Sequence, residues 1–163
     1  MFKKSIYESI SKCIINVITA IMIIAMICPA TVSAFDSSSN VNTTSGLSAE
    51  QIDQMILDVK YDSGLVGLGS AIAEAESTYG VNAYFILGVA SQESGYGNSY
   101  AAQTKNNLFG IMGSNGQVSY SSKSECVMAF ARLISGNTYF GSGRTSPSTI
   151  NSVYAGDSSW KTA

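Results

Sequence analysis

The first 34 residues carry a pattern that separates them from the part of the chain that can form a folded domain. Three lysines precede an apolar run over residues 14–28, Pro29 ends this run, and small residues follow up to Ala34. This order is typical of a secretory signal peptide, residues 1–34, cleaved after Ala34. The alternative is a retained membrane anchor, although the run is shorter than the ~20 residues of a membrane span. We therefore expect an exported protein with transient membrane contact through this leader, and a fold built from residues 35–163.

The remaining chain divides into a polar segment and a helical domain. Residues 35–47 are rich in Ser, Thr and Asn and have no hydrophobic periodicity, which predicts a flexible linker. Residues 48–163 carry the hydrophobic periodicity and are expected to form one domain. They contain no basic stripe, so nucleic acid is not an expected partner. Cys126 is the one cysteine after the leader, so the domain folds without an internal disulfide, and we expect a monomer.

Hydrophobic spacing and capping residues predict an α+β fold that is mostly helical and has one small β-hairpin. Ser48 begins a capping-box sequence, and Asn82 and Ser146 are typical residues for the start of a helix. A Ser-Asn-Gly sequence at residues 114–116 predicts the turn of the hairpin. The expected helices cover residues 49–62, 65–79, 83–94, 100–104, 123–135 and 147–154, and the expected hairpin covers residues 113–120.

The chain contains no histidine, and this absence limits the chemistry that it can perform. Serine–histidine and cysteine–histidine nucleophilic sites are excluded, as are most catalytic zinc sites. We expect no metal ion and no cofactor. Acid–base chemistry at neutral pH must then come from carboxylates, tyrosines or lysines, so the acidic residues are the first candidates for a site.

Glu93 is the only charged residue of its expected helix. It follows Ile86, Val89 and Ala90 at helical spacing, which places all four residues on one stripe. Burial and the negative end of a helix dipole both disfavour the charged form of a carboxylate. A carboxyl group that keeps its proton near pH 7 can act as a general acid, as in glycosidic bond cleavage. The alternative is a structural glutamate that reaches solvent at the helix end or pairs with a cationic side chain.

Two short motifs around Glu93 resemble a known family. The sequence ASQESGYG covers residues 90–97, and NNLFGI follows at residues 106–111. In this order and spacing they resemble the glucosaminidase domain of glycoside hydrolase family 73, a family of peptidoglycan hydrolases, over about residues 65–160. The resemblance implies a lysozyme-like fold with a helical lobe and a small β-hairpin lobe. It also implies a secreted or cell-wall-associated endo-N-acetylglucosaminidase that cuts the glycan strands of peptidoglycan with Glu93 as general acid.

The resemblance also implies a sugar-binding cleft lined by aromatic and neutral polar side chains. Tyr154 corresponds to a tyrosine late in the family pattern. Each aromatic ring has core packing as its alternative role, and the two asparagines have a structural turn as theirs. The residues expected to bind substrate are Tyr96, Asn106, Asn107, Phe109, Tyr120 and Tyr154.

The hairpin segment departs from the family pattern. Many members carry a second carboxylate there, whereas residues 113–123 contain neither Asp nor Glu. Glu125 is expected to stabilise a helix N-terminus, and Asp157 is no better placed as a catalytic partner. Three alternatives follow: the N-acetyl group of the substrate acts as nucleophile, a single glutamate supports a lytic transglycosylase reaction, or a weakly active domain binds or assembles wall material. A secreted structural or adhesion domain is the alternative outside catalysis.

Overall fold

Helices make up most of the regular structure in the computed structural model, which describes residues 35–155. Two short strands pair antiparallel as the hairpin, so the predicted mostly helical α+β fold is confirmed. None of the helices in the described range is long and apolar enough to cross a membrane. The predicted signal peptide and Asp157 lie outside the described residues. The elements are α2 (Ala49–Val59), α3 (Gly69–Tyr79), α4 (Ala83–Ser94), α5 (Tyr100–Thr104), β1 (Met112–Gly113), β2 (Gly116–Gln117), α6 (Lys123–Ser135), the 3₁₀ turn η1 (Phe140–Ser142) and α7 (Pro147–Tyr154).

Most helices begin where the sequence supplies a capping side chain. The Ser48 hydroxyl accepts a hydrogen bond from the Gln51 N–H, and the Gln51 side chain accepts one from the Ser48 N–H, so the predicted capping box is confirmed. Asn82 caps α4 through its side chain, and Ser146 caps α7. Each cap pairs an N–H group that the helix leaves unpaired. These local rules therefore fix where α2, α4 and α7 start.

The start of α3 depends on a tertiary contact instead. Leu68 occupies its N-cap position and provides no capping side chain. Asp53 of α2 accepts hydrogen bonds from the N–H groups of Gly67 (3.1 Å) and Gly69 (2.8 Å). A carboxylate is favourable there because the first N–H groups of a helix are unpaired and carry partial positive charge. The predicted start at residue 65 is too early because this cap comes from another helix.

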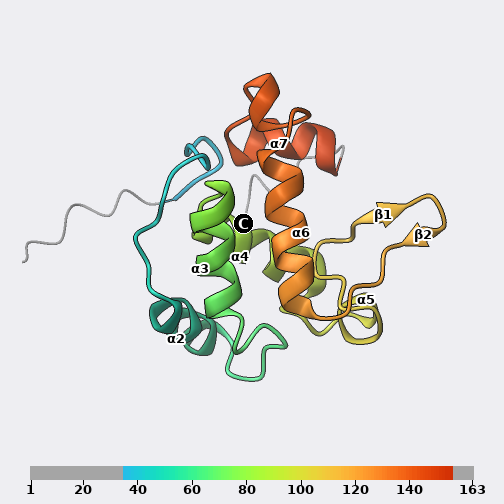
Figure 1. Ribbon diagram of the computed structural model, residues 1–163. Helices are drawn as coiled ribbons and strands as arrows, with labels where there is room; N and C mark the ends of the chain where they lie inside the picture. The colour runs from blue at the N-terminus through green and yellow to red at the C-terminus, as the bar shows by residue number, and fades with distance from the viewer. Residues whose placement is uncertain (1–34, 156–163) are drawn as a thin grey trace, which may run out of the picture. The chain divides into compact units, whose positions relative to one another are not determined.

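The core forms where α3 runs beside α6 (Figure 1). Phe130 of α6 is fully buried and stacks on Phe109, with ring centroids 4.0 Å apart and planes 2° apart. Phe85 of α4 packs against the same ring of Phe130, with centroids 6.0 Å apart. Stacked and tilted aromatic pairs add to the hydrophobic gain from burial. Phe130 therefore joins α4, α6 and the segment before the hairpin in one cluster.

Residues 35–47 belong to the folded domain and are not the flexible linker that their composition predicts. Val41 is fully buried. Its N–H donates to the carbonyl oxygen of Thr145 at 2.7 Å, and its carbonyl oxygen accepts from the N–H of Asn82 at 2.8 Å. Polar composition is a poor guide here because the partners of this segment are distant in sequence.

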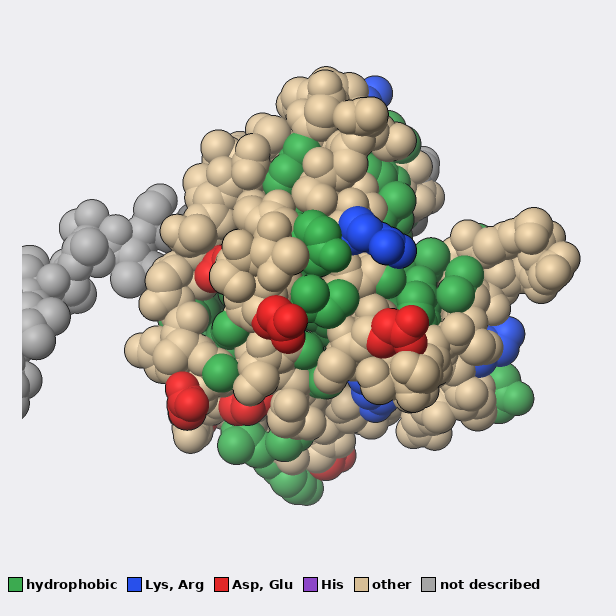
Figure 2. All heavy atoms as spheres, in the orientation of Figure 1, with side chains coloured by type: hydrophobic (Ala, Val, Ile, Leu, Met, Phe, Trp, Pro, Cys, Tyr) green, Lys and Arg blue, Asp and Glu red, His purple; other side chains and the backbone are tan. Residues whose placement is uncertain are grey.

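The hairpin projects from the body of the domain (Figure 1). Met112 pairs with Gln117 and Gly113 pairs with Gly116. The chain turns back over residues 114–115, and Gly116 directly after the turn has a φ of 98°. The Met112 side chain is 66% exposed. On the face shown in Figure 2, acidic and basic side chains are few and apolar side chains gather where the hairpin meets the body. The hairpin thus forms the small lobe, held at its base.

Candidate active site

Glu93 lies in the last turn of α4 and faces Gly110. Ile86, Val89 and Ala90 of the predicted stripe are buried, while Glu93 is partly exposed. Its Oε2 atom lies 3.9 Å from the position that a Cβ would occupy at Gly110. A large side chain at that position would cover the carboxylate. Glycine there leaves one side of Glu93 open.

Tyr154, from α7, lies beside Glu93. Its hydroxyl donates a hydrogen bond to the carbonyl oxygen of Phe109 at 2.6 Å, and its ring meets Phe130 edge-on. Burial raises the pKa of Tyr154, and the negative charge of Glu93 raises it further. The phenol therefore stays neutral at physiological pH and is fixed in orientation next to the glutamate.

The turn after α4 has a left-handed backbone at three consecutive residues. Gly95, Tyr96 and Gly97 have φ values of 55°, 59° and 78°. Glycine adopts this region freely, whereas for Tyr96 it costs about 1–2 kcal/mol. Such residues persist only where the surrounding structure holds them, and they cluster at functional sites. The conformation leaves the Tyr96 side chain at the surface, where it is 38% exposed.

Close backbone packing holds this turn in place. The N–H of Gly64 and the hydroxyl of Ser63 both donate to the Tyr96 carbonyl oxygen, at 2.8 Å and 2.9 Å. A Cβ at Gly64 would lie 2.3 Å from the Gly97 carbonyl oxygen, so the approach of the two loops requires glycine. Lys123 Nζ donates to the carbonyl oxygens of Gly64 (2.7 Å) and Gly97 (3.2 Å). Burial lowers the pKa of Lys123.

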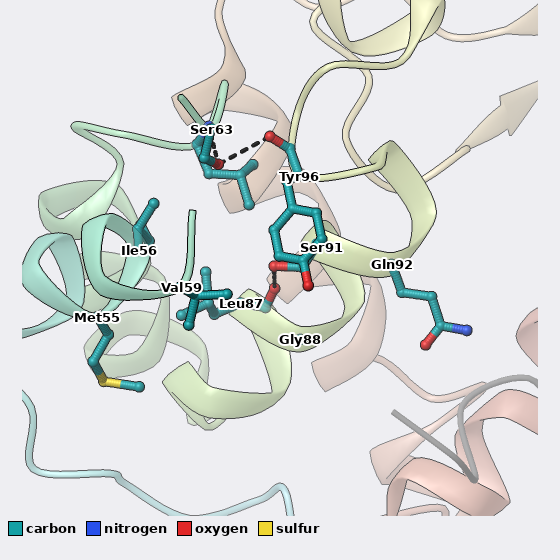
Figure 3. A pocket seen from close by; sticks show the side chains of 10 residues that line it. Met55, Ile56, Val59, Ser63, Leu87, Gly88, Ser91, Gln92 and Tyr96 are labelled. Atoms are coloured by element: carbon teal, nitrogen blue, oxygen red, sulfur yellow. Dashed lines mark hydrogen bonds between the residues drawn. The ribbon is translucent and has the colours of Figure 1, made fainter. Parts of the chain in front are cut away.

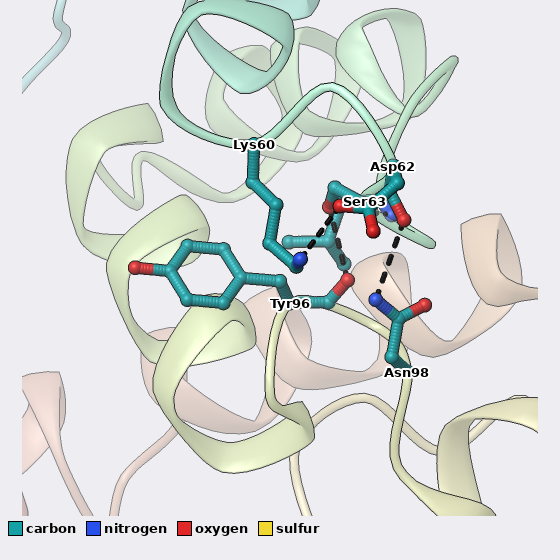
Figure 4. A network of polar contacts seen from close by, with 6 residues as sticks. Lys60, Asp62, Ser63, Tyr96 and Asn98 are labelled. Carbon is teal, nitrogen blue, oxygen red and sulfur yellow. Dashed lines mark hydrogen bonds and ion pairs between the residues drawn. The ribbon is translucent and has the colours of Figure 1, made fainter.

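A second set of polar contacts, nearer to the solvent, also involves this turn and the loop after α2 (Figure 4). Asn98 Nδ2 donates to the carbonyl oxygen of Asp62 at 3.3 Å, and Lys60 Nζ pairs with the Asp62 carboxylate at 2.6 Å. The Lys60 and Asp62 side chains are 34% and 56% exposed. Exposed ion pairs contribute little to stability because solvent screens them. The partly buried hydrogen bonds to the carbonyl oxygens of Tyr96 and Gly97 therefore contribute most to holding the turn.

Asn106 and Asn107 brace the base of the hairpin. Asn107 is 1% exposed; its Nδ2 donates to the carbonyl oxygens of Ile111 and Val118 at 2.9 Å each, and its Oδ1 accepts from the Ile111 N–H at 3.0 Å. Asn106 has a φ of 53° and donates to the Tyr120 carbonyl oxygen at 3.0 Å. The Asn107 amide is fully used within the protein, so it supports the hairpin in place of the predicted contact with substrate.

The two remaining aromatic residues differ in what they offer a ligand. Phe109 is fully buried, and its ring is stacked on Phe130. It has no free face for a sugar, so the prediction that its side chain binds substrate is wrong. Tyr120 is partly exposed; its N–H donates to the Lys105 carbonyl oxygen at 2.9 Å, and burial raises the pKa of its phenol.

Glu125 stabilises the start of α6. Its Oε2 accepts hydrogen bonds from the N–H (2.7 Å) and the hydroxyl (2.6 Å) of Ser121, and these bonds lower the pKa of Glu125. Its own N–H donates to the hydroxyl of Ser122 at 3.1 Å. This is the helix-start role that the sequence predicts for Glu125.

Sequence analysis missed Glu76, the only charged residue among residues 35–155 that is buried. Its carboxylate accepts from the N–H (2.7 Å) and hydroxyl (3.0 Å) of Ser45 and from the N–H of Ala83 (2.7 Å). It therefore ties residues 35–47 to the start of α4, which carries Glu93. Nothing in its local sequence signals this role, because both partners come from other segments.

A hollow of about 490 Å³ opens beside the turn, between α2 and α4 (Figure 3). Tyr96 lines one side of it, and apolar side chains of α2, including Met55 and Val59, line another. Ser91 and Gln92 of α4 supply polar groups, and no charged residue lines the hollow. The surface beside Tyr96, between α2 and α4, therefore includes a neutral, mainly apolar depression.

The described residues provide neither a metal-binding cluster nor a reactive thiol. No group of three or more Cys, Asp or Glu side chains in residues 35–155 is placed to hold a metal ion. Burial raises the pKa of the Cys126 thiol to about 11, and its sulfur accepts a hydrogen bond from the Leu108 N–H at 3.4 Å. A buried thiol with a high pKa is unreactive near pH 7. Its role is to hold the backbone that leads to Gly110.

Sequence comparison identifies one family. The model of the Glucosaminidase family, described as mannosyl-glycoprotein endo-beta-N-acetylglucosaminidase, matches residues 69–163. Proteins of two Streptococcus pneumoniae strains, to which endo-beta-N-acetylglucosaminidase activity is ascribed, are 31% identical to this chain over 123 residues. These alignments cover 69% of this chain but only 18% and 17% of the two relatives.

Structure comparison identifies the fold. Autolysin E of Staphylococcus aureus matches with a TM-score of 0.61 and 21% identity, covering 70% of this chain and 57% of that chain. The same autolysin in complex with the muropeptide NAM-L-Ala-D-iGlu matches with a TM-score of 0.62, covering 72% and 59%. A catalytic mutant of it in complex with the disaccharide NAG-NAM also has a TM-score of 0.62 and covers 74% and 60%. The predicted lysozyme-like fold is confirmed.

Proposed function

Because the chain belongs to the glucosaminidase family of glycoside hydrolases, we propose that it is an exported endo-N-acetylglucosaminidase that cleaves the β-1,4-linked glycan strand of peptidoglycan. The observation that carries this proposal is the position of Glu93, a partly exposed carboxyl group at the end of an apolar helix, with Gly110 and Tyr154 beside it. The sugar ligands of the S. aureus autolysin structures support a glycan as substrate.

In the proposed reaction Glu93 is the general acid. It donates its proton to the glycosidic oxygen while the bond from that oxygen to the anomeric carbon breaks. Tyr154 cannot take this role, because its raised pKa keeps its proton on the phenol, which donates to the Phe109 carbonyl oxygen. Tyr154 instead fixes one wall of the site.

The nucleophile in the proposed reaction is the N-acetyl group of the substrate. Its carbonyl oxygen attacks the anomeric carbon as the leaving oxygen departs, and water then opens the cyclic intermediate and returns a proton to Glu93. The hairpin supplies no carboxylate that could replace this group. Glu125, the next acidic residue, is engaged by Ser121 at the start of α6, which speaks against a catalytic role for it.

A second candidate function is a lytic transglycosylase. The transglycosylase reaction is favoured by the presence of Glu93 without a second carboxylate on the hairpin. That reaction needs one acid–base residue and uses an internal hydroxyl of the sugar as nucleophile. The two reactions leave different ends on the product: a reducing sugar after hydrolysis and an anhydro-sugar after transglycosylation. A domain that binds wall glycan without turnover would leave neither.

Mass spectrometry of the fragments released from purified peptidoglycan tests these functions together. We expect the protein to release fragments with reducing N-acetylglucosamine ends. Glu93→Gln should lower the rate about 10²–10⁴-fold, the range typical of losing a general acid, with an unchanged melting temperature. Glu74→Gln, at an exposed position of α3, is the matched control and should keep full activity. Equal activity of wild type and Glu93→Gln would remove Glu93 from the mechanism, and anhydro ends would establish the transglycosylase.

A further inference from the structure

Asn115 and Gly116, at the tip of the hairpin, form the only Asn–Gly pair in the sequence. In such a pair the backbone nitrogen of the glycine can attack the side-chain carbonyl carbon of the asparagine, because glycine has no side chain to block the approach. The attack closes a succinimide ring between the two residues and leads to deamidation. Whether the pair reacts depends on the room and the backbone freedom that the fold leaves at the hairpin tip.

The structure leaves room for the ring. The Asn115 side chain is exposed in the turn of residues 114–115 and has no hydrogen-bond partner among residues 35–155. A Cβ at Gly116 would meet no atom within 4 Å, so this side of the Gly116 backbone faces open space. No hydrogen bond in the described part of the chain therefore holds the Asn115 amide away from the Gly116 nitrogen.

The hairpin also has the backbone freedom that ring closure needs. Each strand is two residues long, and two residue pairs join the strands, Met112 with Gln117 and Gly113 with Gly116. The hairpin projects from the domain (Figure 1), and its anchor through the Asn107 amide lies at its base. A two-stranded hairpin is marginally stable by itself, so the tip opens at low free energy. The Gly116 nitrogen attacks from this open form.

Asn98 provides an internal comparison, because it is exposed and a small residue, Ser99, follows it. Its Nδ2 donates to the carbonyl oxygen of Asp62 at 3.3 Å. The Ser99 N–H, whose nitrogen would have to attack, donates to the carbonyl oxygen of Ser94 at 2.8 Å. Asn98 thus matches Asn115 in exposure, but both of its reacting groups are held.

We propose that Asn115 is a self-modification site at which the hairpin turns from neutral to acidic as the protein ages, with water as the co-reactant. The Gly116 nitrogen bonds to Asn115 Cγ, the Cγ–Nδ2 bond breaks, and ammonia leaves with the proton of the Gly116 N–H. Water then opens the ring at either carbonyl carbon, which gives aspartate or isoaspartate. No electron is transferred. This chemistry needs neither Glu93 nor a glycan, so it is independent of the proposed function.

The two products act differently on the hairpin. Both add a carboxylate to residues 112–120, which otherwise carry no charged side chain. Aspartate leaves the backbone unchanged and is a common turn residue, so the pairing of β1 with β2 persists. Isoaspartate routes the main chain through the former side chain and so lengthens the backbone of the turn. Because the turn sets the register of a hairpin, we expect isoaspartate to uncouple β1 from β2.

Incubation of the whole chain at mildly alkaline pH, followed by peptide mapping with mass spectrometry, tests the site. We expect Asn115 to deamidate at least tenfold faster than Asn98, with both aspartyl and isoaspartyl peptides formed. Asn115→Gln is the matched control: it keeps an amide at the same exposed position, but its longer side chain makes ring closure much slower. Comparable rates at Asn115 and Asn98, or equal deamidation at position 115 in wild type and Asn115→Gln, would overturn the proposal.

Hydrogen exchange tests the effect of the modification on strand pairing, after chromatography has separated the aged forms from the unmodified protein. The isoaspartyl form should exchange the paired amides of β1 and β2 at least tenfold faster and leave the amides of residues 94–99 unchanged. Asn115→Asp, which has the same charge and an unaltered backbone, should keep the rates of the unmodified protein. An isoaspartyl form that exchanges like Asn115→Asp would contradict the uncoupling of the strands.

Discussion

The turn at the end of α4 and the hairpin that follows it differ in how firmly the rest of the domain holds them. The turn of residues 94–99 is bonded to distant segments: the backbone of Gly64 and the side chains of Ser63 and Lys123 all reach it. The hairpin of residues 112–117 is exposed except at Gly116, which is partly buried, and its main anchors lie at its base. Cutting the contacts of the turn should therefore disturb the whole domain, whereas cutting those of the hairpin should disturb the hairpin alone.

This difference concerns Glu93 directly, because the turn begins one residue after it and the segment leading to the hairpin faces it at Gly110. A catalytic group works best on a rigid support, since small displacements weaken its contact with the reacting atom. The turn provides that support. The hairpin, with few contacts outside its base, belongs to the part of the fold that can open locally at low free energy.

The largest effect is expected from Gly97→Ala, which disrupts the packing of the turn of residues 94–99. The new Cβ would lie 2.6 Å from the carbonyl carbon of Gly64, and the φ of 78° is strained for any residue but glycine. Overpacking and strain together should lower the free energy of unfolding by about 2–5 kcal/mol. Chemical denaturation measures this change.

Gly95→Ala is the matched control for Gly97→Ala. Its φ of 55° carries similar strain, but its Cβ would meet nothing within 4 Å. It should cost about 1–2 kcal/mol, the conformational part alone. Equal losses in the two variants would mean that the close approach to Gly64 contributes nothing.

A smaller and more local effect is expected from Asn107→Ala at the base of the hairpin. The substitution removes three hydrogen bonds, to the N–H and carbonyl of Ile111 and to the carbonyl of Val118. We expect a loss of about 1–3 kcal/mol, the range for leaving buried partners unpaired. Hydrogen exchange should accelerate at the Val118 amide and stay unchanged at the amides of the turn.

Asn106→Gly serves as the control at the neighbouring position. It loses one hydrogen bond, to Tyr120, and relieves the positive φ of Asn106, so the net change should stay below about 1 kcal/mol. If Asn107→Ala instead accelerates exchange in the turn as much as in the hairpin, the two segments open together and the contrast between them is lost.

The smallest effect is expected from Ser121→Ala, where the hairpin segment meets α6. The variant loses the hydroxyl that donates to the Glu125 carboxylate at 2.6 Å. This hydrogen bond is the largest of the interactions that lower the pKa of Glu125 from its usual 4.5. A carboxylate with a lowered pKa in the folded state stabilises the protein above its ordinary pKa, and this contribution disappears as pH falls through the lowered value. Melting temperatures of wild type and Ser121→Ala should therefore differ slightly at pH 7 and converge in acid.

Ser77→Ala is the control for the pH dependence. It also removes a hydroxyl, but that hydroxyl donates to the backbone carbonyl oxygen of Glu74, and a backbone carbonyl has no protonation equilibrium in this range. Its difference from wild type should not vary with the protonation of Glu125. A Ser121→Ala difference that stays constant down to pH 3 would show that the hydroxyl does not act through the carboxylate.

Local rules predicted much of the framework. The capping box at Ser48, the cap at Asn82 and the stripe that ends in Glu93 were predictable because each depends on residues within two turns of one another. The motifs around Glu93 and Asn107 also indicated the family. The cap that Asp53 gives to α3 was not predictable, because it joins two helices across a loop.

By itself, then, the sequence determined the helical stripe with Glu93, the absence of histidine and of a hairpin carboxylate, and the family. Tertiary structure decided which predicted residues can reach a ligand: it buried the Phe109 ring, used up the Asn107 amide, and packed residues 35–47 against the domain through Val41. It also opened a hollow between α2 and α4 beside Tyr96. The physical reason is that periodicity and capping act between neighbours in sequence, whereas burial and hydrogen-bond pairing depend on which distant segments fold against each other.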